Sequence, residues 1–160
     1  MKYIQILVDN KYRDLLNIIV LKNYINDKRN DIKVILTNKK NQHYIYKKIL
    51  PEIVVLPHAR GFMNHHIDYM KENSRILILP TAGANTSDEY LNYRYIQNTT
   101  KDNSKTIRRI YLWGEESKHY LKVSKVFDKS VLLISGLPKF DLLKGKEFDN
   151  SNIGSSIGFS

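Results

Sequence analysis

The chain has 160 residues, which is enough for one domain with a substantial core but too few for two full domains. It has no cysteine, which excludes a disulfide scaffold and a thiolate metal site and agrees with a cytoplasmic setting. No apolar run approaches the roughly 18 residues that span a bilayer, so we expect a soluble chain. The formal charge of +10 favours anionic partners in general, although basic residues this dispersed are also typical of an ordinary solvated surface.

The first part of the chain alternates short apolar runs with helical patterns. The apolar runs predict strands over residues 3–8, 32–36, 53–56 and 76–79. Helices are predicted between them, and in the first helix Tyr12, Leu15, Leu16 and Ile19 share one apolar face. A further helix passes through Tyr90, Leu91 and Tyr95, and residues 98–105 are expected to form a polar loop. This alternation predicts an α/β fold with a Rossmann-like parallel sheet and helices on both faces.

The stretch from residue 107 to residue 143 is the most regular part of the chain. It predicts a strand over 107–113, a helix from Gly114 to about Phe127, and a strand over 131–135. The last strand is apolar at consecutive positions, which is typical of a strand covered on both faces. Gly136 and Pro138 then predict a defined turn, because Gly136 permits unusual backbone angles and Pro138 fixes its own φ.

Two short motifs in this stretch carry a resemblance. Trp113-Gly114-Glu115, followed one helix and one strand later by Gly136-Leu137-Pro138-Lys139-Phe140-Asp141, resembles the bacterial surface-carbohydrate (polysaccharide) biosynthesis family. Related Gly-x-Pro exits occur in CDP-glycerol glycerophosphotransferases and UDP-N-acetylglucosamine 2-epimerases. The family pattern has Asn where Leu137 stands and Arg where Lys139 stands. An anion would therefore meet the single charge of a lysine ammonium group, and not the paired N–H donors of a planar guanidinium.

The resemblance implies a two-domain, GT-B-like architecture, of which this chain would be the amino-terminal half. Residues 1–144 are then the Rossmann-like acceptor-side domain. Residues 145–160 are expected to be a linker, rich in polar residues and glycine, and the first strand of a truncated carboxyl-terminal domain.

Candidate site residues follow the predicted strands, because ligands of open parallel sheets bind beyond the carboxyl ends of the strands. The predicted substrate-binding residues are Asp9, Asn10, Arg60, Thr81, Gly83, Asn85, Gly136, Lys139 and Asp141. Within the 81–87 loop, Gly83 would allow a ligand to approach the backbone closely. The hydroxyl and amide side chains of the loop could bind a sugar or a phosphate. The alternative for this loop is a plain connection without a binding role.

Two residues are candidate catalytic groups. His58 follows a predicted strand, would titrate near neutrality as an ordinary histidine, and has Arg60 close by to hold an anionic group, so it is a candidate general base. The alternative is that His58 caps a loop in solvent. By resemblance, Glu115 would hydrogen-bond an acceptor hydroxyl, and the alternative is that its carboxylate complements the positive end of a helix.

Several motifs of cofactor and metal sites are absent from the sequence. Asp9-Asn10-Lys11 stands where a dinucleotide-binding chain has its glycine-rich turn, and there is no Walker loop or nucleophile elbow. His65 and His66 are adjacent, so on a helix their side chains should diverge by about 100° and form no shared metal face. We therefore expect no metal and no cofactor in this fragment, and a nucleotide-sugar donor for the full-length protein.

By resemblance, the full protein would transfer a sugar from a nucleotide-activated donor to an envelope glycan or a lipid-linked acceptor. The donor would bind mainly to the missing carboxyl-terminal domain, so this fragment alone is expected to be inactive. The location would be cytoplasmic, with peripheral contact at the inner face of the membrane.

The sequence leaves open whether the chain is part of an enzyme. One alternative keeps the architecture but makes the reaction glycerophosphate transfer or sugar-nucleotide epimerisation. Another is a non-catalytic basic α/β module that binds nucleic acid or a different anionic partner, nucleic acid being the less favoured of the two.

Overall fold

A computed structural model describes residues 1–59, 63–80, 88–96 and 99–136. Within these residues one parallel sheet contains the strands β1 (Lys2–Leu7), β2 (Ile32–Thr37), β3 (Ile53–Leu56), β4 (Arg75–Ile78), β5 (Ile107–Leu112) and β6 (Leu132–Ile134). The helices are α1 (Lys11–Lys28), α2 (Gln42–Ile49), α3 (Asn64–Met70), α4 (Asp88–Leu91), α5 (Lys101–Thr106) and α6 (Glu115–Ser124). A π-helical turn spans Asn92–Ile96, and a 3₁₀ turn spans Lys129–Val131. The predicted α/β, Rossmann-like fold is confirmed.

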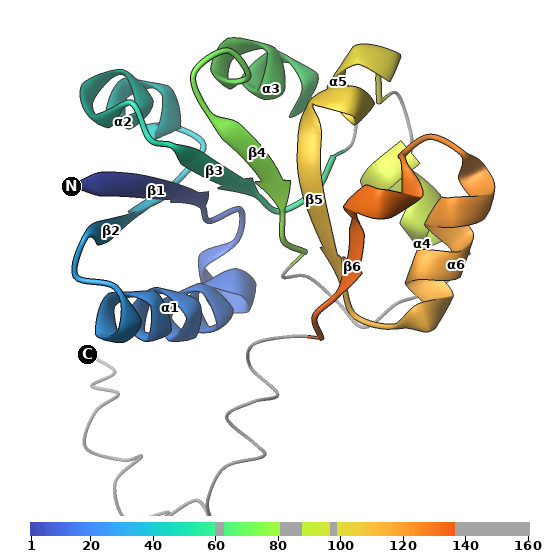
Figure 1. Ribbon diagram of the computed structural model, residues 1–160, viewed down its shortest axis with the longest axis horizontal. Coiled ribbons are helices and arrows are strands. Elements are labelled where there is room, and N and C mark those ends of the chain that lie inside the picture. Colours follow the sequence, from blue (N-terminus) through green and yellow to red (C-terminus); the bar gives the residue numbers. More distant parts are fainter. Residues whose placement is uncertain (60–62, 81–87, 97–98, 137–160) are drawn as a thin grey trace, which may run out of the picture.

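The strand order β2-β1-β3-β4-β5-β6 decides which face each helix covers. The chain moves from β1 outward to β2, returns past β1 to β3, and then continues in one direction. Because parallel crossovers are right-handed, α1 lies on one face and the later helices lie on the other (Figure 1). We call these the α1 face and the helix-rich face.

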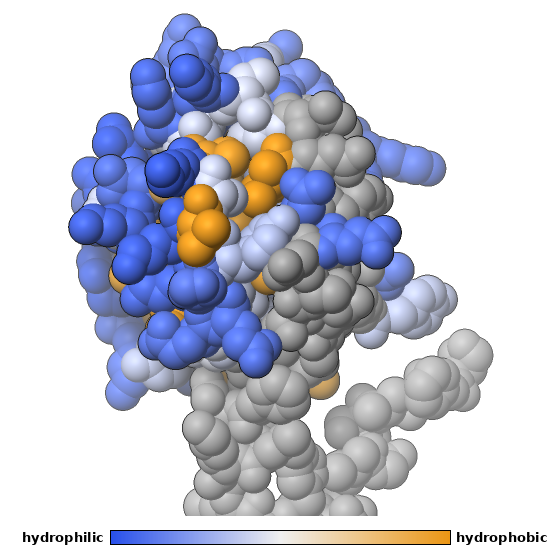
Figure 2. Space-filling view, turned by 90° about the vertical axis from the view of Figure 1, so that its right-hand side faces the viewer, coloured by the Kyte–Doolittle hydropathy of each residue, from blue (hydrophilic) through white to orange (hydrophobic). Residues whose placement is uncertain are grey.

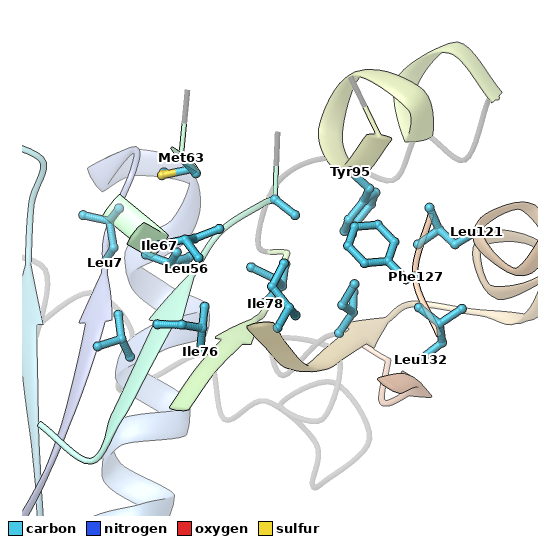
Figure 3. Packing of buried hydrophobic residues seen from close by; sticks show 14 of the residues in the cluster. Leu7, Leu56, Met63, Ile67, Ile76, Ile78, Tyr95, Leu121, Phe127 and Leu132 are labelled. Atoms are coloured by element: carbon cyan, nitrogen blue, oxygen red, sulfur yellow. The ribbon is translucent and has the colours of Figure 1, made fainter. Parts of the chain in front are cut away.

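The helix-rich face holds the larger of the two apolar clusters (Figure 3). Ile76 and Ile78 of β4 and Leu121 of α6 are fully buried there. Met63, Ile67 and Met70, which recur at helical spacing, are also fully buried. Phe127 packs in the same cluster, beyond the end of α6.

The α1 face is covered differently from the prediction. Tyr12 is 96% exposed, and Leu16 and Ile19 also face solvent, so the predicted inward face of α1 was wrong. Ile18 is buried instead and packs with Leu21 and other residues against the sheet. Apolar residues occur around much of α1, so spacing alone could not select the face that packs.

Helix α5 occupies residues that were predicted to be a polar loop. Thr100 begins it, because its Oγ1 accepts a hydrogen bond from the backbone N–H of Asn103. The Asn103 Nδ2 donates to Asn64 Oδ1 of α3 at 2.9 Å, which fastens α5 to its neighbour. The prediction failed because this helix is held by a cap and amide bonds, and not by an apolar stripe.

The β6 edge of the sheet is less covered than predicted. Helix α6 ends at Ser124, where Lys125 takes a left-handed conformation with φ 56°, and Val123 is left exposed. Leu133 and Ile134 of β6 are each more than a third exposed, so this strand is not buried on both faces. Figure 2 faces this side of the molecule and shows a few apolar side chains within a mainly hydrophilic surface.

Strand β5 contains an irregularity that affects the direction of its side chains. Ile76 of β4 pairs with Ile107, but the next residue, Leu77, pairs with Arg109, so Arg108 is an extra residue in β5. As a result Ile107 and Ile110, three residues apart, both face the helix-rich cluster.

Candidate functional site

The strand order creates a switch point at the carboxyl ends of β1 and β3. The crossovers that leave these two neighbouring strands run on opposite faces, so the loops after them separate, and binding sites of open α/β sheets form at such a point. Asp9 and Asn10 follow β1, and His58 follows β3. Three of the predicted site residues therefore lie at the switch point.

Asp9 and Asn10 are already engaged by neighbouring groups. The Lys39 Nζ lies 2.5 Å from Asp9 Oδ1, which links the loops after β1 and β2. The Asn10 Oδ1 accepts from the backbone N–H of Tyr12 at 3.0 Å, and the Asn10 N–H donates to Asp14 Oδ2 at 2.9 Å. Asn10 thus caps the start of α1, which leaves its predicted substrate-binding role without support from the geometry.

A shallow hollow of about 400 Å³ opens beside Asp9. Its lining includes Lys11 at the start of α1, Thr37 at the end of β2, and Asn38 and Asn41 from the loop after β2. The hollow offers a carboxylate, an ammonium group and amides at the carboxyl edge of the sheet. Val8, Leu15 and Leu36 also line it, so the hollow combines apolar side chains with a few polar groups, as small-molecule sites commonly do.

His58 is completely buried, so the alternative in which it caps a loop in solvent was wrong. The next residue, Ala59, is also buried, and its carbonyl accepts a hydrogen bond from Thr99 Oγ1. The role of His58 as a general base stays a prediction. In this conformation a substrate could reach it only after the surrounding groups moved.

Glu115 and Gly136 lie at the carboxyl ends of β5 and β6. Glu115 is exposed in the first turn of α6, where its charge also complements the helix dipole. Gly136 has φ +70°, as its predicted turn requires, and its N–H donates to Leu112 O at 3.2 Å. Trp113 Nε1 donates to Pro80 O at 3.1 Å and joins the ends of β5 and β4.

The described site residues therefore form two groups along one edge of the sheet. Strand β4 lies between β3, which His58 follows, and β5, so the two groups are about 10 Å apart at the usual strand spacing. The other predicted site residues lie outside the described residues: Arg60, Thr81, Gly83, Asn85, Lys139 and Asp141.

A cluster of three histidines was missed by sequence reasoning. The rings of His65 and His66 are 3.6 Å apart between centroids, and His43 of α2 joins them, so the expected divergence of the pair was wrong. One ring nitrogen from each of His43, His65 and His66 lies within 4.8 Å of the other two. We call these three residues the histidine cluster.

The topology brings the histidine cluster together. His43 is the second residue of α2, and His65 and His66 are the second and third residues of α3. Helix α2 begins after the carboxyl end of β2 and α3 after that of β3, the two strands that flank β1, and both helices cover the same face of the sheet (Figure 1). The signal available in the sequence was thus the equivalent position of the histidines in two successive helices.

A buried polar network connects the histidine cluster to the sheet. The Gln5 Nε2 donates to Thr37 Oγ1 at 3.2 Å and to the backbone carbonyl of Gln42 at 2.9 Å. The Gln42 side-chain amide lies 3.1 Å from His66 Nδ1, and His43 Nε2 lies 2.7 Å from the same atom. Side chains of α2 therefore contact the ring of His66 directly, and Gln5 of β1 and Thr37 of β2 are linked to it through Gln42.

The surroundings of His43 and His66 favour neutral rings. Burial lowers the pKa of His66 to about 4, and the neighbouring His65, His43 and Lys39 act in the same direction. Burial, followed by His65 and Lys47, also lowers the pKa of His43. At neutral pH these imidazoles therefore have a nitrogen lone pair that can accept a proton or bind a metal.

No protein-family model matches this chain, and no curated protein matches its sequence. Among the helices in the described ranges, none combines the length and the apolar character that crossing a bilayer requires.

Proposed function

We propose that this chain is the acceptor-side domain of a GT-B-like glycosyltransferase that acts in surface polysaccharide synthesis. The observation that carries the proposal is the position of the first motif relative to Gly136, the first residue of the second motif. Trp113-Gly114-Glu115 follows β5, and Gly136 follows β6, which is the hydrogen-bonded neighbour of β5. Residues that are separated along the chain thus come to adjacent positions at the edge where α/β proteins bind ligands.

In this proposal the carboxyl edge faces the acceptor. Glu115 accepts a hydrogen bond from an acceptor hydroxyl, and the hollow beside Asp9 holds a more distant part of the acceptor. The nucleotide-activated donor binds to a second domain, so residues 1–160 alone have no transferase activity. The basic surface of the chain favours contact with anionic lipid headgroups, near which lipid-linked acceptors lie.

The first test is to read the coding sequence beyond Ser160. The proposal requires a second α/β domain of similar size, and a stop codon after Ser160 would contradict it.

The second test uses adjacent glutamates in the whole protein. Glu115→Gln removes the proposed acceptor contact, whereas Glu116→Gln removes the charge of a second exposed glutamate in the same helical turn. We expect at least a tenfold loss of sugar transfer from Glu115→Gln and less than a twofold loss from Glu116→Gln, with equal melting temperatures. Equal losses in both variants would assign the effect to the helix dipole and contradict the proposed role.

A second candidate function is an anion-binding module without catalysis. A polar hollow of about 530 Å³ at the opposite, amino edge of the sheet is lined by Lys71, Arg75, Lys105 and Arg108, together with Glu52 and Glu72. Binding of a polyanion that weakens steeply with salt, and that Arg75→Ala and Arg108→Ala reduce, would favour this function. Negligible binding near physiological salt would exclude it.

A further inference from the structure

We propose that the histidine cluster binds one divalent transition-metal ion, such as Zn²⁺, through ring nitrogens of His43, His65 and His66. The proposal rests on the geometry of these side chains and is independent of the proposed transferase function. Imidazole nitrogen suits zinc, copper, nickel and cobalt, and three imidazoles on one zinc ion form a known type of open site.

The distances are close to those that a metal would require. With metal–nitrogen bonds of about 2.0–2.1 Å, ligand atoms in a tetrahedral site lie about 3.3 Å apart. The candidate ligand atoms of the histidine cluster are within 4.8 Å of one another, and His43 Nε2 and His66 Nδ1 are already 2.7 Å apart. His65 is exposed, so its ring can turn towards the other two without moving the core.

The surroundings of the cluster orient the ligands. The ring of Tyr69 stacks on His43 at 4.6 Å between centroids, with planes 20° apart. The Gln42 side-chain amide lies 3.1 Å from both nitrogens of His66, so it can stay beside that ring whichever nitrogen binds the metal. Metal-binding histidines commonly donate their second N–H to an oxygen acceptor, which fixes the ring, so the Gln42 amide would fill this role with its Oε1 turned towards His66.

The charge around the cluster selects the remaining ligand. Imidazole is a neutral ligand, and Lys39 lies close enough to His66, and Lys47 to His43, to lower the pKa of that ring. The metal charge would therefore be compensated by an external anion at the fourth position. Three protein ligands leave this position open, as in zinc sites that bind a water or a substrate.

The test is a titration of the chain, prepared without a polyhistidine tag, with Co²⁺, whose visible absorption reports its coordination. We expect saturable binding of one Co²⁺ per chain with the intense bands of a four-coordinate site, and displacement of Co²⁺ by Zn²⁺. Absence of saturable binding would overturn the proposal.

Two single variants distinguish metal binding by the histidine cluster from metal binding by any exposed histidine. His65→Ala removes an exposed member of the cluster, and His119→Ala removes an exposed histidine on α6. We expect His65→Ala to weaken Co²⁺ binding at least tenfold and His119→Ala to change it less than twofold. Equal losses, or no loss from His65→Ala, would overturn the three-histidine site.

A second measurement tests whether the variants remain folded. Since both substituted residues are exposed, the variants should keep the circular dichroism spectrum of the parent chain. Zn²⁺ should raise the melting temperature of the parent and of His119→Ala, but not that of His65→Ala. A rise of equal size in all three proteins would place the metal elsewhere and overturn the proposal.

Discussion

The two faces of the sheet are built from alternate residues of the same strands, yet they are covered to different degrees. On the helix-rich face, Ile76 and Ile78 of β4 are completely buried beneath α3 and its neighbours. On the α1 face, Leu77 of the same strand is only partly buried and lines an apolar groove of about 280 Å³ beside α1. A continuous apolar run therefore shows that both faces of a strand avoid water, but not that both are equally packed.

The first prediction compares two adjacent residues of β4. Ile78→Ala should lower the free energy of unfolding by about 2–5 kcal/mol, because it leaves a cavity in a closed core. Leu77→Ala should lower it by about 1–2 kcal/mol, because the side chain is already partly hydrated. Urea denaturation at constant m-value measures both. Equal losses would mean that the α1 face is as closed in solution as the helix-rich face.

The second prediction uses a substitution that keeps the side-chain shape. Val54 and Val55 of β3 belong to the helix-rich and α1 clusters respectively. Val54→Thr buries a hydroxyl group and should cost about 1–3 kcal/mol. Val55→Thr should cost less than about 1 kcal/mol, because its hydroxyl can reach water in the groove. A greater loss from Val55→Thr, measured in the same way, would contradict the difference between the faces.

The smallest predicted effect concerns the turn that follows α1. The Arg29 Nε and Nη2 donate to Asp31 at 2.8 Å each, and this contact lowers the pKa of Asp31 from 3.8 to about 2. Since the folded pKa lies below the unfolded one, the contact stabilises the fold above about pH 4, and this contribution is lost as the pH falls towards 2.

Asp31→Asn should therefore lower the melting temperature slightly at pH 7, with the difference disappearing near pH 2. Asp27→Asn, at another exposed position near the end of α1, is the control and should show no such convergence. A difference that persists unchanged at pH 2 would show that the effect of Asp31→Asn does not come from its charge.

The sequence predicted the strands well because each is a short apolar run, and the order of strands and helices then implied a parallel sheet. It did not predict the inward face of α1, where Ile18 and not Tyr12 is buried, because apolar residues occur on several sides of that helix. Helix α5 was missed because it is stabilised by the Thr100 cap and by the hydrogen bond from Asn103 to Asn64. A search for apolar periodicity does not detect such polar interactions.

The candidate site was predicted only as far as local sequence determines it. Residues after strands, such as Asp9 and Glu115, were found because topology places them at the carboxyl edge. The histidine cluster depends on how two helices pack beside each other, which is tertiary information. The burial of His58 likewise depends on residues distant in the sequence and could not be deduced from its position after β3.

The extra residue Arg108 has a consequence for how β5 can change its length. In a regular strand, deletion of one residue exchanges inside and outside for every position that follows. In β5 the alternation of buried and exposed side chains is already interrupted at Arg108, because Ile107 and Ile110 face the same side. Deletion of Arg108 would restore simple alternation and leave Ile110 and Leu112 in the core. This point is therefore where the strand could lose a residue while its buried side chains keep their places.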